Sequence, residues 1–234
     1  MSRVVYIATD TGDNMKKTTL KQQAYDLIKS KIIYCEYAPG TILNEDMLGE
    51  TIKGSRTPIR DAIGRLEQEG LVTILPKKGI LVSELSISEV TAMFETRFLL
   101  EPYAIEKFGS RIDPADFTDY YQNFLSFQED PEAYTNSDKY NLDNQFHQGF
   151  IDATQNRYIT SIYEQVTAQN TRLRVLTGSR NDARLTDTQK EHLLIAELCL
   201  KQDWTGAANA MRQHIKLSKN VAFELLLKKG DWII

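Results

Sequence analysis

The chain has 234 residues, of which 41% are hydrophobic and 26% are charged, as in a soluble globular protein with one large domain or two small ones. No apolar run approaches the roughly 20 residues that cross a bilayer, and the first 17 residues lack the features of a signal peptide. We therefore expect a cytoplasmic protein. Cys35 and Cys199 form no Cys-x-x-Cys pair, which excludes a disulfide framework and a thiolate metal site.

The net charge of −4 is unfavourable for binding to a polyanion, so the distribution of charge matters more than its sum. Residues 16–84 contain 11 Lys and Arg against 9 Asp and Glu, whereas residues 85–234 contain 16 against 21. The basic excess lies in the N-terminal third of the chain. It is too small to identify a nucleic-acid-binding protein without further evidence.

The N-terminal third begins with residues 1–15, whose turn-rich sequence predicts a flexible tail. A helix is expected from about residue 18 to Tyr34, and the segment Ala38-Pro39-Gly40 ends it. Its apolar stripe comprises Leu20, Ala24, Leu27, Ile28 and Ile32. A second, short helix fits Glu45–Ile52, with Asn44 as its N-cap.

A third helix is predicted between Ser55 and Gly70, with Pro58 in its first turn. Its buried face comprises Ile59, Ala62, Ile63 and Leu66. After Gly70 the hydrophobic pattern changes from a helical period to alternation. Apolar residues lie on both sides of the turn Pro76-Lys77-Lys78-Gly79, which predicts a β-hairpin. Three helices followed by a hairpin predict a winged helix-turn-helix domain over residues 16–84.

From Ser86 onward every periodic segment is helical, and Ser86-Ile87-Ser88-Glu89 is a capping-box pattern. The first helix has Val90, Met93, Phe94, Phe98 and Leu99 on one side. Further helices are expected at about residues 113–128, 131–154, 158–176, 188–201 and 205–228. The fold class is therefore mainly α, with an all-α antiparallel bundle over residues 85–234 behind the winged domain.

The third helix carries the side chains that reading a DNA major groove requires. Arg56 and Arg60 are four residues apart and share a face, from which one can contact a guanine and the other a phosphate. Ser55 and Thr57 can donate to phosphates or bases. Lys77 and Lys78 suit the flanking minor groove or backbone. The same residues also fit a solvated surface helix followed by an exposed turn.

The order of motifs then favours DNA binding. Pro39-Gly40, Leu48, the run from Ser55 to Ile63, Leu66-Glu67 and Glu69 to Val72 with Gly79 together resemble the DNA-binding domain of GntR-type transcriptional regulators. The resemblance implies that Arg56 and Arg60 are the principal DNA contacts, assisted by Ser55, Thr57 and Gly79. The chain departs from the family at Lys53-Gly54, in the turn of the helix-turn-helix.

The three histidines of the chain all lie in the predicted bundle, and their spacing suggests a metal site. Asp143 and His147 are one helical turn apart, so their side chains point the same way. His192 and His214 are at similar distances from the turn between two successive helices. One carboxylate and three imidazoles form a ligand set for zinc and other first-row divalent metals. This spacing also arises by chance, with the histidines as hydrogen-bonded core residues.

Asp143 to His147 with Asn156, Glu191-His192, and Asp203 through Ala207 to His214-Ile215 resemble the C-terminal domain of the FadR subfamily, called FCD. The resemblance implies that Asp143, His147, His192 and His214 bind a metal within the bundle, where a small carboxylate effector can complete its coordination. Zinc is the expected metal, with nickel, manganese or iron as alternatives. Arg97 and Arg174 are candidates to neutralise the effector, although Arg97 also fits a structural salt bridge to Glu101.

These observations predict a homodimeric, DNA-binding transcriptional repressor that reads double-stranded operator DNA and responds to a small carboxylate. One alternative is a regulator for which the metal is itself the signal. Another is a mononuclear metal-dependent enzyme, although no obvious general base accompanies the four ligands, and the basic hairpin would have no role. We therefore do not expect an enzyme.

Overall fold

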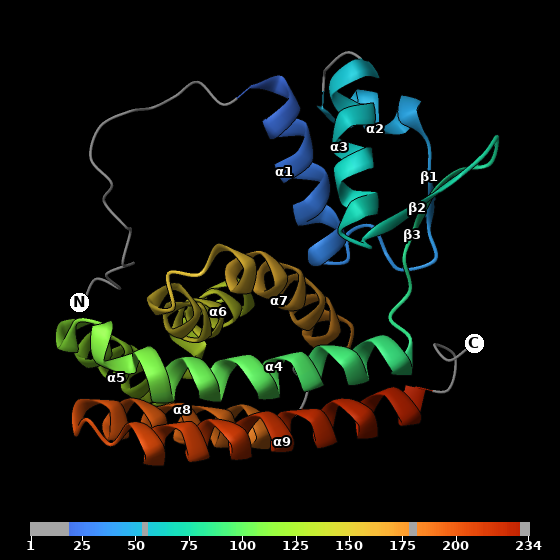
Figure 1. Cartoon of the computed structure of the whole chain (residues 1–234). Coiled ribbons are helices and arrows are strands. Elements are labelled where there is room, and N and C mark those ends of the chain that lie inside the picture. The colour runs from blue at the N-terminus through green and yellow to red at the C-terminus, as the bar shows by residue number, and fades with distance from the viewer. Residues whose placement is uncertain (1–18, 53–55, 178–181, 230–234) are drawn as a thin grey trace. The chain divides into compact units, whose positions relative to one another are not determined.

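The computed structural model describes residues 19–52, 56–177 and 182–229, and the tail predicted for residues 1–15 lies outside them. The chain divides into two compact units, residues 1–84 and 85–234. The first contains three helices and a small sheet, and the second is helical throughout its described residues (Figure 1). The predicted fold class, a winged helix-turn-helix followed by a helical bundle, is confirmed.

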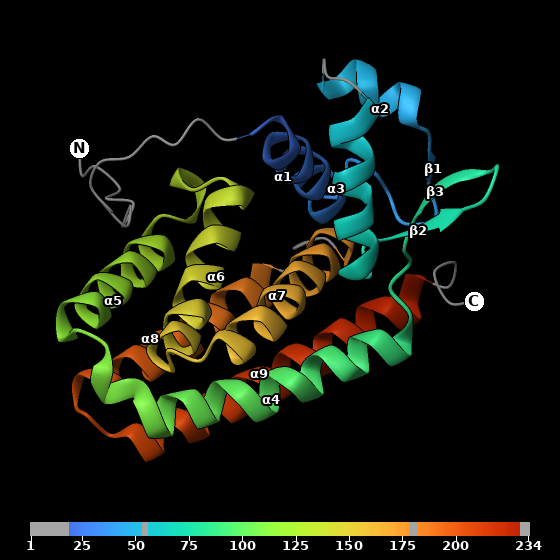
Figure 2. The same cartoon turned by 45° about the horizontal axis from the view of Figure 1, so that its top comes forward.

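The helices of the first unit are α1 (Leu20–Ile33), α2 (Glu45–Ile52) and α3 (Arg56–Gln68) (Figure 2). Asn44 caps α2 as expected, because its side chain accepts a hydrogen bond from the Met47 amide at 2.8 Å. The predicted buried face of α3 is also confirmed. The prediction for α1 was partly wrong: Leu20 and Leu27 are exposed, and Tyr25 is buried instead.

The sheet of the first unit has three antiparallel strands in the order β1-β3-β2. The hairpin strands β2 (Val72–Leu75) and β3 (Gly79–Val82) agree with the predicted alternation. Strand β1 (Ile42–Leu43) was not predicted, because two residues are too few to show a period.

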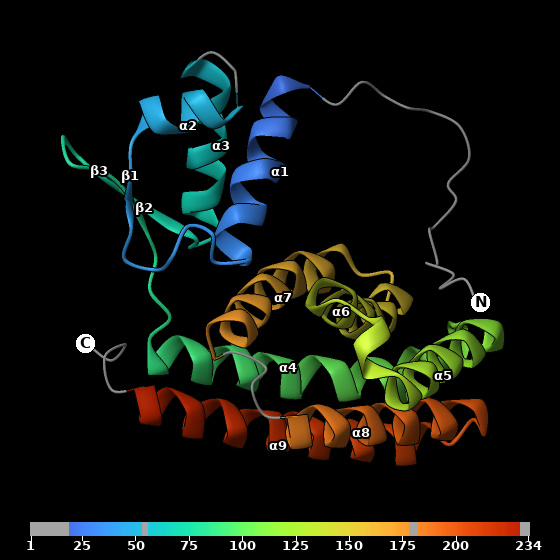
Figure 3. The same ribbon diagram turned by 180° about the vertical axis from the view of Figure 1, so that it is seen from behind.

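The second unit contains six long helices among its described residues (Figure 3). They are α4 (Ile87–Phe108), α5 (Pro114–Glu129), α6 (Asn136–Ala153), α7 (Arg157–Thr177), α8 (Asp182–Leu200) and α9 (Trp204–Lys229), with short 3-10 turns at Gly109–Arg111 and Pro131–Ala133. Helix α9 packs against α4 and α8, while α6 and α7 pack against α4. None of the helices within the described ranges has the length and apolar character needed to span a membrane.

Two boundaries in the bundle differ from the predictions. Helix α6 begins at Asn136 rather than at Pro131, because Thr135 and Asp138 form a capping box there. Helix α8 begins at Asp182, six residues before the predicted start at Thr188. Its early turns lack the apolar period on which the prediction depended.

The buried face of α4 agrees with the prediction at Val90, Met93 and Phe94 but differs from it further along the helix. Phe98 and Leu99 are exposed, with 44% and 71% of their surfaces accessible, whereas Arg97 and Glu101 are buried. A helix packed on several others would be expected to bury its apolar residues. The reversal therefore indicates that the interior of this bundle contains a polar site.

Gly79 is constrained by the sheet itself. It has a φ of +120°, and a Cβ at this position would lie 2.6 Å from the carbonyl oxygen of Leu43 in β1. A side chain would therefore be strained by the backbone conformation and would also clash with the neighbouring strand. This packing explains a glycine here whether or not the residue contacts DNA.

We expect Gly79→Ala to destabilise the first unit by about 1–3 kcal/mol, because alanine tolerates neither the φ nor the approach of β1. Gly64→Ala is the matched control. Gly64 lies in α3, and a methyl group there would have no side chain and no backbone of another element within 4 Å. It should stabilise the unit by about 0.5–1 kcal/mol. Hydrogen exchange of the β3 amides measures both changes in stability. Equal protection in the two variants would show that the structure does not require a glycine at position 79.

Candidate metal centre and DNA-reading surface

The structure brings the four predicted metal ligands together from three helices. Asp143 and His147 lie on α6, His192 on α8 and His214 on α9, and all four side chains are buried. The ligand nitrogens of the three histidines lie within 4.8 Å of one another. The expectation from the i, i+4 spacing and from the antiparallel turn thus agrees with the geometry.

Asp143 lies beside two of these histidines. Its Oδ1 is 3.6 Å from His192 Nε2, and its Oδ2 is 3.9 Å from His147 Nε2. Opposite donors on a first-row ion bound at about 2.1 Å are separated by about 4 Å. The spacing of the donor set is therefore close to that required around one ion.

Two carboxylates determine which nitrogens of the histidines face the centre. His147 Nδ1 donates to Glu101 Oε2 at 2.7 Å, and His214 Nδ1 donates to Glu191 Oε2 at 2.8 Å. Because a carboxylate can only accept, each of these rings carries a proton on Nδ1, which leaves Nε2 as the nitrogen that can bind a metal. Carboxylate partners of this kind orient metal-binding histidines in proteins.

His192 differs from the other two histidines. It is fully buried, and neither of its ring nitrogens has a hydrogen-bond partner among the described residues. Its ring lies 4.8 Å from that of Phe124 and 5.3 Å from that of Phe146, measured between centroids. A buried imidazole held by aromatic rings and without a partner is costly, so the site fits a metal that would accept the lone pair.

The ionisation states in the site suit metal binding. Burial lowers the pKa of both His192 and His214 well below the usual value, and in each case a neighbouring imidazole lowers it further. Burial alone would raise the pKa of Asp143, but Arg174 and the imidazoles outweigh burial and hold that pKa below its usual range. Two neutral imidazoles and an ionised carboxylate are the forms that bind cations.

Arg174, a predicted effector contact, pairs with Asp143. Its NH1 donates to Asp143 Oδ2 at 2.5 Å, while the other carboxylate oxygen faces His192. The side chain of Arg174 remains partly exposed, at 26%. Arg174 therefore orients Asp143 and has donors left for a ligand.

Arg97, the other predicted effector contact, forms the salt bridge to Glu101 that the sequence left open. Its Nε donates to Glu101 Oε1 at 2.6 Å, and Tyr163 donates to the same oxygen at 2.7 Å. Burial alone would raise the pKa of Glu101, but Arg97 and His147 outweigh it and hold that pKa well below its usual range. Glu101 is thus an ionised carboxylate at the centre of the bundle.

A cavity of about 140 Å³ opens beside Asp143 and His214. Three cationic side chains, Arg97, Lys139 and Arg174, and one acidic side chain, Asp143, line it. The remaining lining is polar or apolar: Phe94, Tyr140, Asn170, Leu173, Thr177, Thr188, Gln189, His214, Ser218, Val221, Ala222 and Leu225. Its charge favours a small anion.

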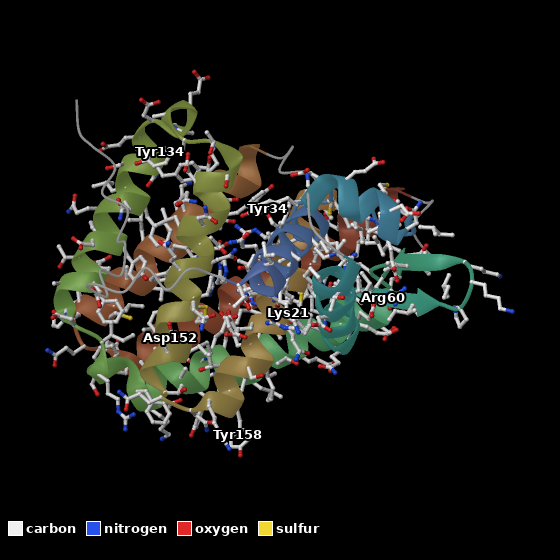
Figure 4. The ribbon with its side chains drawn as sticks, turned by 90° about the horizontal axis from the view of Figure 1, so that it is seen from above. Lys21, Tyr34, Arg60, Tyr134, Asp152 and Tyr158 are labelled. Atoms are coloured by element: carbon white, nitrogen blue, oxygen red, sulfur yellow. The ribbon has the colours of Figure 1, made fainter. Side chains whose placement is uncertain are left out.

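In the first unit, the Arg60 side chain projects from α3 and is 66% exposed (Figure 4). Its Nε donates to Glu45 Oε1 of α2 at 2.8 Å. Thr57 at the start of α3 and Lys77 and Lys78 in the hairpin turn are exposed. Ser55, the side chain of Arg56 and the unusual turn at residues 53–54 lie outside the described part of the chain.

The comparisons with known proteins agree with this architecture. Residues 20–82 match the family described as bacterial regulatory proteins, gntR family, and residues 92–217 match the FCD domain. The chain belongs to the GntR family of regulators that carry an FCD domain. It is thus a DNA-binding transcriptional regulator, and its families and relatives are regulators rather than enzymes.

Individual relatives extend over most of the chain. The HTH-type transcriptional repressor RspR of Escherichia coli is 25% identical over 91% of this chain and 93% of its own length. The HTH-type regulator YdhC of Bacillus subtilis is 28% identical over 86% of this chain and 88% of its own. The structure of McbR/YncC from E. coli superposes with a TM-score of 0.75 at 18% identity, over 88% of this chain and 98% of that one, which supports the fold.

Sequence reasoning did not identify some residues of the site. It assigned no role to Glu191, Tyr163 or Lys139, and it considered Glu101 only as a partner of Arg97. The contacts of Glu101 with His147 and Tyr163, and of Glu191 with His214, join different helices, so no local spacing links these residues. The spacing of Arg97 and Glu101, one helical turn apart on α4, is a local signal for their pairing.

We expect Arg97→Leu to destabilise the second unit by about 3–5 kcal/mol, because it leaves Glu101 buried without its main counter-ion. Arg212→Leu is the control: the Arg212–Glu106 pair is more exposed, at 3.6 Å, and its loss should cost at most about 1 kcal/mol. Trp204 begins helix α9 of this unit, so tryptophan fluorescence during urea unfolding reports on it. Equal losses in the two variants would show that the Arg97–Glu101 pair is not essential.

Proposed function

We propose that this regulator is a repressor whose affinity for operator DNA is controlled by a small carboxylate that binds at a metal site in the helical bundle. The observation that carries the proposal is His192, a fully buried imidazole without a hydrogen-bond partner among the described residues. It faces Asp143 and lies beside the other two histidines. A metal ion explains why such a group is buried here.

Asp143, His147, His192 and His214 would hold the ion, and zinc suits a set of three imidazoles and one carboxylate. Nickel, manganese and iron accept the same donors. When bound, the ion supplies a positive charge with a coordination position open to a carboxylate. Glu101 and Glu191 would keep the Nε2 atoms of His147 and His214 directed at the ion.

The cavity beside Asp143 and His214 supports an acid as the effector. Arg174 uses NH1 for Asp143, so its other donors can bind a carboxylate. Arg97 has its Nε on Glu101 and its NH1 3.4 Å from Asn170, so it would contribute mainly charge. A conformational response requires that the acid bind two states of the protein with different affinity.

For DNA, α3 would enter the major groove with Arg56, Thr57 and Arg60, assisted by Ser55. Lys77, Lys78 and Gly79 of the hairpin would lie on the flanking backbone or minor groove. Arg60 would exchange Glu45 for a base or phosphate, an exchange that costs little because the pair is exposed. A homodimer would bind a palindromic operator. RspR is described as a repressor, which supports repression as the mode of action.

We expect Arg56→Ala and Arg60→Ala each to weaken binding to DNA from the protein's own promoter by about 1–3 kcal/mol, roughly 5- to 150-fold. Fluorescence anisotropy at one fixed salt concentration measures the affinity. Arg212→Ala removes the same charge from the second unit and should leave the affinity unchanged. If all three variants bind as the wild type does, α3 is not the reading helix.

We expect the protein as purified to contain about one metal ion per chain, and the double variant His147→Ala/His192→Ala to lose it. Asp143→Asn should also weaken retention, because it replaces a charged oxygen donor. Asp152→Asn makes the same change at an exposed position of α6 that pairs with Gln148 (Figure 4). Elemental analysis after dialysis measures the content, and full retention by the double variant would refute the site.

A further inference from the structure

We propose that Glu67 is a positioning residue for DNA binding. It holds the hairpin of β2 and β3 at the angle to α3 that brings Lys77, in the hairpin turn, against the DNA that flanks the major groove. Glu67 would not touch DNA and would act only through the hairpin. This inference rests on the proposed function, because it concerns the hairpin contact with DNA that is proposed there.

The first observation is a hydrogen bond between α3 and the edge of the sheet. The backbone amide of Ile74 in β2 donates to Glu67 Oε1 at 2.8 Å. Strand β2 lies at one edge of the order β1-β3-β2, so the amides on its outer side have no neighbouring strand to bind. A carboxylate that accepts from such an amide forms a charge-assisted hydrogen bond, roughly twice as strong as a neutral one. Glu67 thus fixes the edge of β2 to α3.

The second observation is the place of this bond along the hairpin. On β2, Val72 is buried in the core of the first unit, whereas Thr73 and Ile74 are exposed. Full burial on β2 is therefore confined to its base, and the bond at Ile74 lies two residues closer to the turn. The hairpin extends beyond the helices of the unit, so a small change of its angle to α3 moves the turn farther (Figure 1). A bond from α3 at this place restrains that angle.

The third observation is the conformation of the turn. The amide of Lys78 donates to the carbonyl of Leu75 at 3.0 Å, which closes a turn with Pro76 and Lys77 at its centre. Lys77 has a φ of +63°, a left-handed conformation that glycine or asparagine adopts at lower cost. Costly backbone conformations of this kind cluster at functional sites. An exposed lysine kept in this conformation indicates that its charge is used.

The position of Glu67 on α3 supports an indirect role. Glu67 follows Arg60 by seven residues, about two helical turns, so the two residues lie on the same face of α3. A free carboxylate on the face that reads DNA would repel the phosphates. Because the carboxylate of Glu67 accepts from Ile74, it is directed at the hairpin instead. An acidic residue on this face therefore has a reason in the position of the hairpin.

The affinity of the full-length protein for DNA from its own promoter tests the inference, measured by fluorescence anisotropy at one fixed salt concentration. Glu67→Ala removes the acceptor, whereas Glu67→Gln removes the charge and keeps an oxygen that accepts from Ile74. We expect Glu67→Ala to weaken binding about threefold or more. Glu67→Gln should bind at least as tightly as the wild type. Hydrogen exchange of the Ile74 amide should be faster in Glu67→Ala and close to that of the wild type in Glu67→Gln.

Lys77 supplies a measurement that a merely structural role of Glu67 would not change. We expect Lys77→Ala to weaken binding about three- to tenfold and to lower the slope of log affinity against log salt concentration by about one. In the Glu67→Ala background the same substitution should weaken binding less than about twofold, because the turn is already displaced from DNA. The two residues are then coupled through the hairpin.

Glu50→Ala is the matched control, because Glu50 is an exposed glutamate of α2 in the same unit and the substitution is identical. It should not weaken binding, and it should leave the effect of Lys77→Ala at its full size. Unchanged far-ultraviolet circular dichroism shows that each variant is folded, and Glu67→Gln guards against a folding defect in the alanine variant.

The outcomes separate the inference from the function on which it rests. If Glu67→Ala and Glu67→Gln bind equally well, or if Lys77→Ala keeps its full effect in the Glu67→Ala background, Glu67 does not position the hairpin, while the hairpin contact with DNA stands. If Lys77→Ala leaves both the affinity and the salt slope of the otherwise wild-type protein unchanged, the hairpin contact is refuted and the inference with it.

Discussion

The burial of one ionised carboxylate, Glu101, constrains much of the second unit. A buried charge is stable only when it is paired and hydrogen-bonded, and Glu101 obtains its partners from three helices: Arg97 on its own helix α4, His147 on α6 and Tyr163 on α7. The three helices must therefore keep their relative positions. Because His147 is one of these partners, the histidine cluster is oriented by the same network that stabilises the bundle.

The three histidines are held in two different ways. His147 and His214 are each fixed through Nδ1 by a carboxylate, Glu101 or Glu191, whereas His192 is held only by the rings around it. A hydrogen bond fixes both the tautomer and the direction of a ring, but aromatic packing fixes only its plane. His192 consequently has no partner that fixes which nitrogen carries the proton, and Nε2 is the nitrogen that faces Asp143, at 3.6 Å from Oδ1.

The sequence predicted those features that depend on local spacing. The helical period located the helices, and the i, i+4 relation placed Asp143 beside His147. The sequence did not predict the pairing of Glu101 with His147, which joins residues 46 positions apart. Nor did it predict that Gln189 lines two cavities. The error on α4 has the same origin, because the apolar period of its sequence assigns Phe98 and Leu99 to the interior. The polar site inside the bundle reverses that preference.

Gly79 and Arg60, two residues of the family motif in the first unit, differ in what they imply about contact with DNA. Gly79 has a sufficient reason within the fold, since β1 approaches too closely for a side chain, so its agreement with the family motif is no evidence for contact with DNA. Arg60 has no comparable reason: it is exposed, and its pair with Glu45 is of the kind that adds little to stability. An exposed arginine of this kind, on the helix proposed to enter the major groove, is therefore the stronger argument. Glu45 would approach the same phosphates. In the free protein it pairs with Arg60, and it would therefore compete weakly with DNA for that side chain.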